Sequence, residues 1–532
     1  MTVTRANPAC LLDVQSTANF SWLAVFSDTE RNMNRRIAIS ASLLCLAVAA
    51  KPAADLFKNK LSGDLQIQHA LSRLTFGARP GDAAFVKKLG LKKWISLQLH
   101  PPSIAESPKL EEKLAGLKTL TMSAPDMAET YPPPQVIKAM AEGKAKLPED
   151  PARREQMSAL VAIYNRRNHG VEERLTLAQK KSLLLNPPPG QTVAAEIVEA
   201  KLYRAVYSER QLSEVMTDFW FNHFNVFLDK GPDRYLTTSY ERDAIRPHVL
   251  GKFGDLLRAT AQHPAMLFYL DNWQSTVAAK GRAKGLNENY ARELMELHTL
   301  GVDGGYTQQD VVEVARCFTG WTIRPDGRGR AGLYGGEFVY DPRLHDLGEK
   351  TVLGVKIPAG GGQADGEKVL DLLLRHPSTA KFMARQLATR FVADDPPAAL
   401  VDRLAAKFHE SGGDIAKVME TMLESREFLS EGAYQSKMKS PLELVVSAVR
   451  AAGAEVERPL ALANLLKTMG QPLYRKQEPT GYSNNGEDWS NSASLLARLN
   501  FAVALEQNMA SGVRVATLPP GLDLRAPAFQ KR

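Results

Sequence analysis

Cysteine is scarce in this sequence of 532 residues, which contains only Cys10, Cys45 and Cys317. The first two precede the residue at which we expect the mature chain to begin, so the mature chain would carry Cys317 alone. A single cysteine excludes an intramolecular disulfide. The amphipathic pattern around Cys317, VVEVARCF, predicts a buried structural thiol rather than a nucleophile.

Long apolar runs are also missing. The uncharged run at residues 37–50, IAISASLLCLAVAA, is too short to span a bilayer, which requires about 20 apolar residues. Two arginines precede this run and small residues end it, an order typical of a secretory signal peptide. We therefore predict a signal peptide at residues 33–50, starting at Met33, that directs the chain through the Sec pathway to the periplasm or to secretion. Residues 1–32 are then a non-native upstream extension, and no transmembrane anchor is left after cleavage.

A concentrated basic surface is missing as well. The formal net charge of +8 is spread along the chain, whereas nucleic-acid-binding proteins gather basic residues on one face or tail. We therefore expect no nucleic-acid partner. A phosphate-binding loop is also excluded, because Glu367 follows Gly366 where that motif needs lysine. HExxH and Gly-x-Ser-x-Gly patterns do not occur.

Helical periodicity dominates the pattern that is present. Apolar residues recur at spacings of three and four along most of the chain, for example at 192–207 and 379–391. Glycines and β-branched residues near 323–362 predict a small β-hairpin insertion. The expected fold class is therefore all-α, with a single large multi-helix domain over residues 65–505. Residues 515–532 are rich in proline and charge, and we predict that they form a disordered tail.

The segment 287–301 predicts a helix with Asn287 as its N-cap and Gly301 as its C-terminal stop. One face of this helix is dense in carboxylates around a single arginine, and His298 falls on the opposite, apolar arc. This pattern fits either a solvated ion-pair face with a structural histidine or a polar site. The polar face carries, in order, Glu288, Asn289, Arg292, Glu293 and Glu296.

A second histidine lies on an apolar helix face. The segment 212–227 predicts a helix, and His223 is in the middle of its apolar face. A buried neutral imidazole must form hydrogen bonds, bind a metal or titrate. Two such histidines beside a carboxylate-rich helix leave two interpretations open, namely satisfied structural histidines and a polar site where these helices meet.

Several short motifs occur together and in a fixed order. They are 69–77 (HALSRLTFG), 220–224 (WFNHF), 263–267 (HPAML), 287–298 (NENYARELMELH), 305–307 (GYT), 319–321 (TGW), 345–346 (HD) and 439–443 (KSPLE). Through them the sequence resembles the bacterial family catalogued as domain of unknown function 1800. The resemblance implies an exported protein, often encoded beside a second exported protein with a sulfatase-like fold, which would be a working partner. It implies no particular activity.

The leading hypothesis is a metal-dependent or general acid/base hydrolase that acts on an extracytoplasmic ester. In it, histidines bind a divalent metal or transfer protons, carboxylates orient them, and an arginine holds an anionic substrate group. The predicted catalytic residues are Glu293, Arg292, Glu296 and His298, the predicted metal ligands are His223 and His298, and His345 and Asp346 lie on a loop predicted to cover the site.

The alternative hypothesis is a non-catalytic partner or scaffold for the sulfatase-like protein or for cell-envelope assembly. The same polar residues would then form a buried network that fixes helix packing. A third hypothesis is carbohydrate binding by the segment 474–489, whose aromatic, glycine and asparagine residues predict an ordered loop. A capping loop over the core is the simpler interpretation of that segment.

Overall fold

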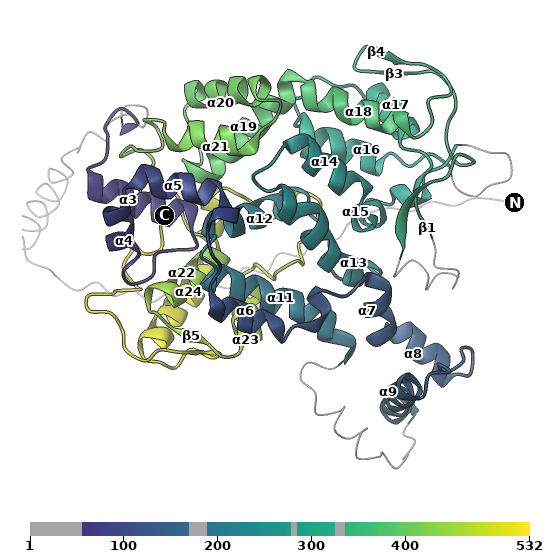
Figure 1. Ribbon diagram of the computed structural model, residues 1–532, viewed down its shortest axis with the longest axis horizontal. Helices are drawn as coiled ribbons and strands as arrows, with labels where there is room; N and C mark the ends of the chain where they lie inside the picture. Colours follow the sequence, from purple (N-terminus) through teal and green to yellow (C-terminus); the bar gives the residue numbers. More distant parts are fainter. Residues whose placement is uncertain (1–55, 170–188, 278–284, 325–335) are drawn as a thin grey trace, which may run out of the picture. The chain divides into compact units, whose positions relative to one another are not determined.

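The computed structural model describes residues 56–169, 189–277, 285–324 and 336–532 (Figure 1). Residues 53–532 form one compact unit. The predicted signal peptide at 33–50 and the upstream extension at 1–32 lie outside the described residues. No helix within the described ranges has the length and the apolar character that a bilayer crossing requires.

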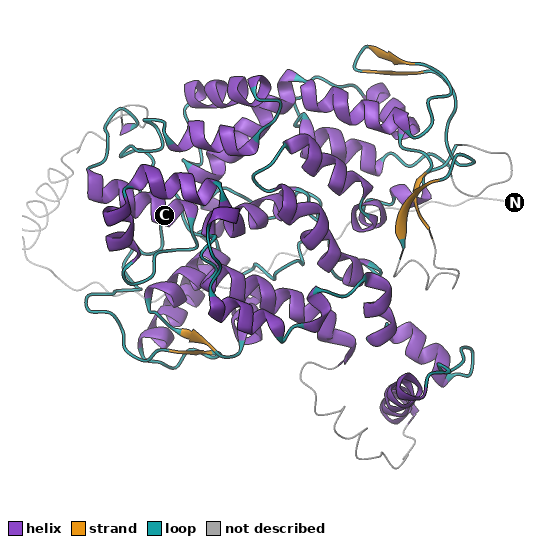
Figure 2. Cartoon of the chain, viewed as in Figure 1, coloured by secondary structure: helices purple, strands orange, loops and turns teal. Residues whose placement is uncertain are grey.

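The fold is mainly helical with small hairpins, which confirms the predicted fold class (Figure 2). The helices that shape the described chain are α3 (Gly63–Leu74), α4 (Asp82–Leu89), α5 (Leu91–Leu99), α6 (Pro108–Ala115), α7 (Ala124–Thr130), α8 (Pro134–Ala141), α9 (Pro151–His169), α11 (Pro189–Tyr207), α12 (Gln211–His223), α13 (Asp233–Ser239), α14 (Phe253–Gln262), α15 (Pro264–Tyr269), α16 (Asn289–Glu293), α17 (Gln308–Cys317), α18 (Ala364–Arg375), α19 (Pro377–Phe391), α20 (Ala398–Glu410), α21 (Ile415–Leu423), α22 (Pro441–Ala451), α23 (Pro459–Thr468) and α24 (Ser492–Glu506), with π-helical turns η3 (Tyr240–Ile245) and η6 (Leu294–Thr299).

Three antiparallel two-stranded sheets accompany the helices. They are β1 (Trp321–Arg324) with β2 (Glu337–Tyr340), β3 (Lys350–Val352) with β4 (Val355–Ile357), and β5 (Glu455–Val456) with β6 (Val513–Arg514). The region near 323–362 thus holds parts of two consecutive hairpins, and residues 325–335 within it lie outside the described residues.

Local sequence signals explain where several helices begin. Ser440 caps α22, and the Glu443 carboxylate accepts a hydrogen bond from the Ser440 backbone N–H, so the two form a capping box. His263 starts α15 in the same manner, since its Nδ1 accepts a hydrogen bond of 3.1 Å from the Ala265 N–H. His263 is therefore the N-cap residue of α15.

The beginning and the end of the domain pack against each other (Figure 1). Arg450 on α22 is 2 % exposed and donates hydrogen bonds of 2.5 Å to the carbonyl oxygens of Gly77 and Val206. Gly77 has a φ of +108°, and a Cβ there would lie 2.5 Å from the Cβ of Ser447. Only glycine permits this close approach of the segment after α3 to α22.

The predicted disordered tail is wrong, because residues 515–532 pack onto the domain. Leu524 and Arg532 are 1 % and 4 % exposed, and Lys531 forms an isolated antiparallel bridge with Met438. Arg532 also forms an ion pair with Glu443. Composition alone cannot reveal a buried carboxylate elsewhere in the chain that holds the segment.

Two predicted helix ends also differ from the structure. α12 ends at His223, four residues earlier than predicted, and the chain continues in a turn. The segment 287–301 forms the short α16 followed by the π-helical turn η6. Gly301, with a φ of +83°, ends that turn as predicted.

Candidate functional site

The structure brings His223 and His298 together. His223 is the last residue of α12, and its Nε2 donates a hydrogen bond of 3.1 Å to the backbone carbonyl oxygen of His298 in η6. The two ring centroids are 6.1 Å apart. Trp220 and Phe224 pack against these rings, with centroid distances of 5.5 Å to His223 and 5.0 Å to His298 respectively. Packing of α12 against η6, which no local pattern encodes, produces this pair.

Burial keeps both imidazoles neutral. It lowers the pKa of His223 to about 4, against a smaller opposing effect of the hydrogen bond to His298. Burial, followed by the nearby His223, lowers the pKa of His298 to about 3. The buried Nε2 of His298 has no hydrogen-bond partner in the described part of the chain. Since a general base works best with a pKa near the working pH, neither ring is tuned for that role at pH 7.

A metal site needs more ligands than this pair supplies. Structural and catalytic metal sites usually draw three or four ligands from the protein. In the ranges that the structure describes, no three or more His, Cys, Asp or Glu residues are grouped so as to hold a metal ion. The predicted ligands His223 and His298 therefore have no third protein ligand there.

Glu293, Glu296 and Arg292 lie on the more open side of the same turn. Burial raises the pKa of Glu293, the negative charge of Glu296 raises it further, and Arg292 opposes both effects. The Tyr306 hydroxyl donates a hydrogen bond of 3.3 Å to Glu296. Arg292 contacts Glu288 at 3.3 Å. The carboxylates and His298 thus share one helical segment but not one face.

His345 and Asp346 belong to other contacts. His345 is 3 % exposed, and its two ring nitrogens face the Thr319 carbonyl oxygen at 2.7 Å and an Asp365 carboxylate oxygen at 3.2 Å. Lys350 contacts the same Asp365 oxygen at 2.8 Å. Asp346 pairs with Arg316, and this hydrogen bonding lowers the pKa of Asp346. None of these contacts involves the His223–His298 pair, so the structure does not place this loop on it.

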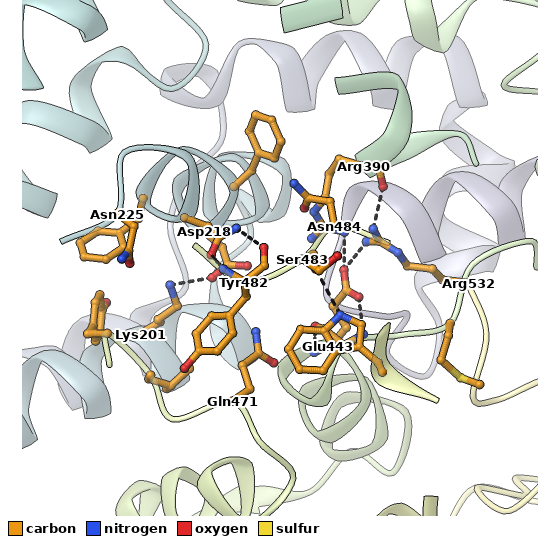
Figure 3. Close-up of a pocket in the computed structure, with 18 residues that line it drawn as sticks. Lys201, Asp218, Asn225, Arg390, Glu443, Gln471, Tyr482, Ser483, Asn484 and Arg532 are labelled. Carbon is orange, nitrogen blue, oxygen red and sulfur yellow. Dashed lines mark hydrogen bonds and ion pairs between the residues drawn. The ribbon is translucent and has the colours of Figure 1, made fainter. Parts of the chain in front are cut away.

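A pocket opens on the other side of α12. It lies between α11, α12, the start of α22 and the segment 471–489, and Figure 3 shows its walls. The lining side chains combine charged residues, amides and aromatic rings. They are Lys201, Asp218, Phe219, Phe221, Asn222, Asn225, Arg390, Met438, Ser440, Glu443, Gln471, Leu473, Tyr474, Tyr482, Ser483, Asn484, Trp489 and Arg532.

Two charged groups face this pocket from different sides (Figure 3). On one side, Lys201 pairs with Asp218 at 2.7 Å, and its ammonium lies 4.9 Å from the centre of the Tyr474 ring. On the other side, Glu443 pairs with both Arg390 and Arg532. The pocket can therefore offer both a positive and a negative group to a polar ligand on each of these two sides.

The segment over the pocket is firmly attached to α12. The Asn222 side chain donates a hydrogen bond of 2.7 Å to the Tyr482 carbonyl oxygen and accepts one of 2.7 Å from the Tyr482 N–H. Asn225 donates to the carbonyl oxygens of Lys476 and Glu478, both at 3.0 Å. Paired amide contacts of this kind fix both the position and the orientation of the segment relative to α12. Residues 474–489 thus form an ordered loop, as their composition predicts.

The sequence does not indicate the pocket residues on α11, α12 and α22. The motif WFNHF points to His223, yet the neighbouring Asn222 reaches the pocket. A signal was available for Glu443, because Ser440 and Glu443 have the spacing of a capping box. No local signal could show that Arg390 and Arg532 meet this carboxylate.

Comparison with known proteins identifies a family and no individual relative. The family model with the description "Protein of unknown function (DUF1800)" matches residues 69–526. This match confirms the resemblance carried by the eight motifs. No curated protein and no solved structure matches the chain.

Proposed function

The chain belongs to the family described as Protein of unknown function (DUF1800), whose description assigns no activity, and we propose that it is an exported binding protein. Its pocket would capture a terminal polar group of a saccharide-type ligand at the cell envelope. The observation that carries this proposal is the anchored aromatic segment over a pocket with charged groups on two sides.

The chemistry of the pocket supports binding. Tyr482 and Trp489 pack with ring centroids 5.9 Å apart and supply flat apolar surface, on which the C–H face of a sugar can stack. The side chains of Ser483 and Asn484 offer polar contacts beside them. The cavity volume is about 60 Å³. An engineered cavity that holds benzene measures about 150 Å³, so one small group of a larger ligand fits here.

A binding experiment tests this proposal. Isothermal titration of the mature protein with neutral and acidic oligosaccharides measures affinity directly. Asp218→Asn removes the charge beside Lys201 without changing shape, and we expect it to weaken binding about tenfold. Asp255→Asn, on an exposed position of α14, is the matched control and should leave affinity unchanged. Absence of binding by every oligosaccharide contradicts the proposal.

Export is part of the proposal and is supported by the pattern of residues 33–50. A gene that starts at Met33 should give a processed protein in the periplasm or medium whose N-terminal sequence begins near Lys51. Retention of residues 33–50 on the purified protein contradicts this processing.

A second candidate function is hydrolysis, and the raised pKa of Glu293 favours it. A half-buried carboxyl that keeps its proton to higher pH can act as a general acid. Glu293→Gln should then lower hydrolysis of a chromogenic ester or glycoside at least about 100-fold. Glu288→Gln, a more peripheral carboxylate on the same segment, is the control. Equal rates for the two variants contradict a role for Glu293.

The predicted partnership with an exported sulfatase-like protein derives from the family resemblance. In it, this chain would present a bound ligand to the partner or support it as a scaffold. Co-purification of the two exported proteins, with and without ligand, is the measurement. Separate elution under both conditions contradicts the partnership.

A further inference from the structure

Cationic side chains outnumber carboxylates behind one end of the pocket. We define this cationic cluster as Arg73, Arg390, Lys437, Lys439, Arg498 and Arg532, all 7 % exposed or less. Among the described side chains, the carboxylates paired with it are Glu443 and Asp394. A protein interior rarely tolerates such an excess, because a buried charge without a counter-charge is strongly destabilising.

The pocket reaches this cluster through Arg390, Arg532 and Glu443 (Figure 3). The Glu443 oxygen Oε1 accepts from both guanidinium groups, while its Oε2 accepts from the Ser440 N–H at 2.8 Å. One carboxylate oxygen therefore serves two arginines, each of which has five N–H donors. The buried Nε of Arg532 has no hydrogen-bond partner in the described chain.

Arg498 on α24 is the least satisfied member of the cluster. It is 0 % exposed, and its Nε donates a hydrogen bond of 3.1 Å to Ser494 Oγ. Its two terminal nitrogens, Nη1 and Nη2, have no partner among the described residues. Glu443 acts on its charge from nearby, since that carboxylate opposes the effect of burial, which lowers the pKa of Arg498 to about 10.

Lys439 shows the same shortage of negative charge. Its Nζ donates a hydrogen bond of 2.7 Å to the Phe529 carbonyl oxygen and lies 3.9 Å from the centre of the Phe529 ring. Burial lowers the pKa of Lys439 to about 7, Glu443 opposes this effect, and Arg498 adds to it. An additional anion near Glu443 would supply the charge that these groups lack.

We propose that the Arg390–Arg532 end of the pocket binds an oxyanion, so that the captured terminal group is a sulfate, phosphate or carboxylate. This inference rests on the proposed function for the identity of the rest of the ligand. The small cavity would hold the oxyanion, and the saccharide that carries it would lie in the open mouth of the pocket. Arginine pairs bind such oxyanions through parallel N–H donors. Arg498 stabilises the bound charge from behind, through the field of its unpaired guanidinium.

Titration with inorganic sulfate and phosphate tests the charged end by itself. Isothermal titration of the mature protein should show saturable binding of either anion in the millimolar range or tighter, at constant ionic strength held with chloride. General stabilisation by sulfate grows without saturation, so saturation distinguishes a site from a salt effect. Absence of saturable binding by both anions overturns the proposal.

Variants of Arg498 test the assignment within the cluster. Arg498→Met should weaken anion binding about 10- to 100-fold, the value of a charge-assisted interaction. Its unfolding temperature without added anion should equal or exceed that of the unsubstituted protein, because an unpaired buried charge is removed. Arg498→Lys keeps the charge and should bind with intermediate affinity. It also serves as the test if Arg498→Met does not fold.

Arg403→Met, an exposed position on α20, is the matched control and should bind as the unsubstituted protein does. Unchanged anion affinity in both Arg498 variants overturns the proposal. The two proposals fail separately in these experiments. Inorganic anions that bind while no oligosaccharide does contradict the saccharide proposal alone, and neutral oligosaccharides that bind while no anion does contradict the oxyanion alone.

Discussion

His223 and His298 meet through a side-chain-to-backbone hydrogen bond. Because a carbonyl oxygen can only accept, the Nε2 of His223 carries the proton, and its Nδ1 is the lone-pair nitrogen of a neutral ring. The bond ties the last residue of α12 to the π-helical turn η6. Under the non-catalytic hypothesis, this hydrogen bond would serve to fix helix packing.

Acid should weaken the fold through His298. An unfolded histidine takes up a proton below pH 6.5, while folded His298 stays neutral down to a pKa of about 3. Its contribution to stability is therefore complete above pH 6.5 and falls by about 1.4 kcal/mol per pH unit below it. His298→Gln should destabilise the protein about 2 kcal/mol less at pH 5 than at pH 7.5. Urea unfolding at both pH values measures the difference.

The control for this experiment is His409→Gln, at an exposed position of α20. We expect it to change the free energy of unfolding equally at the two pH values. An identical cost of His298→Gln at pH 5 and pH 7.5 contradicts the buried neutral state of His298.

Cys317 should resist modification in the folded protein. It is 0 % exposed, and burial raises the pKa of its thiol to about 12, so little thiolate exists at neutral pH. Reaction with a thiol reagent should be complete in denaturant and negligible in the native state over the same minutes. Rapid native labelling of the mature protein contradicts the structure around α17.

The buried Asp365 should contribute strongly to stability. It accepts from Lys350 at 2.8 Å, and both side chains are 0 % exposed. Asp365→Asn removes the nearest counter-charge of the ammonium and leaves only Asp346 at 4.0 Å, and we expect a loss of about 3–5 kcal/mol in the free energy of unfolding. Asp371, on the same helix α18, forms a half-exposed pair with Arg258 of α14, and Asp371→Asn should cost less than about 1 kcal/mol. Similar losses in the two variants contradict this account.

Asn222 should control the order of the segment over the pocket. Asn222→Ala removes both hydrogen bonds to Tyr482, and Asn485→Ala changes an exposed amide of the same segment. Hydrogen exchange at the Tyr482 amide should accelerate about tenfold in the first variant and stay unchanged in the second. Unaltered hydrogen exchange at Tyr482 in Asn222→Ala contradicts this role of Asn222.

Part of the fold could be predicted because it depends on short-range patterns. Apolar spacings of three and four gave the helical class, and Gly301 ended its segment as expected. The packing of residues 515–532 could not be predicted, because it depends on the ion pair between Arg532 and Glu443. No sequence pattern between these two residues indicates that contact.

The candidate site, too, could be predicted from the sequence only in part. Burial of His298 and partial burial of His223 followed from their positions on apolar faces, but their contact needed the packing of α12 against η6. The separation of Glu293 from the buried His298 was expected, because the helical pattern places them on opposite arcs. The neighbouring Asn222 contributes to the pocket because α12 presents adjacent residues in different directions.

By itself, the sequence determined the helical class and the family, since each depends on composition or on neighbouring residues. It also predicts an export signal, whose removal would leave one cysteine in the mature chain. Only the tertiary structure decided that the tail is packed, that the two histidines are neutral and joined, and that cationic side chains gather behind a pocket. Charge and burial act through space, so residues far apart in sequence set them. Arg73, Arg390, Glu443 and Arg498 become neighbours only after the chain has folded.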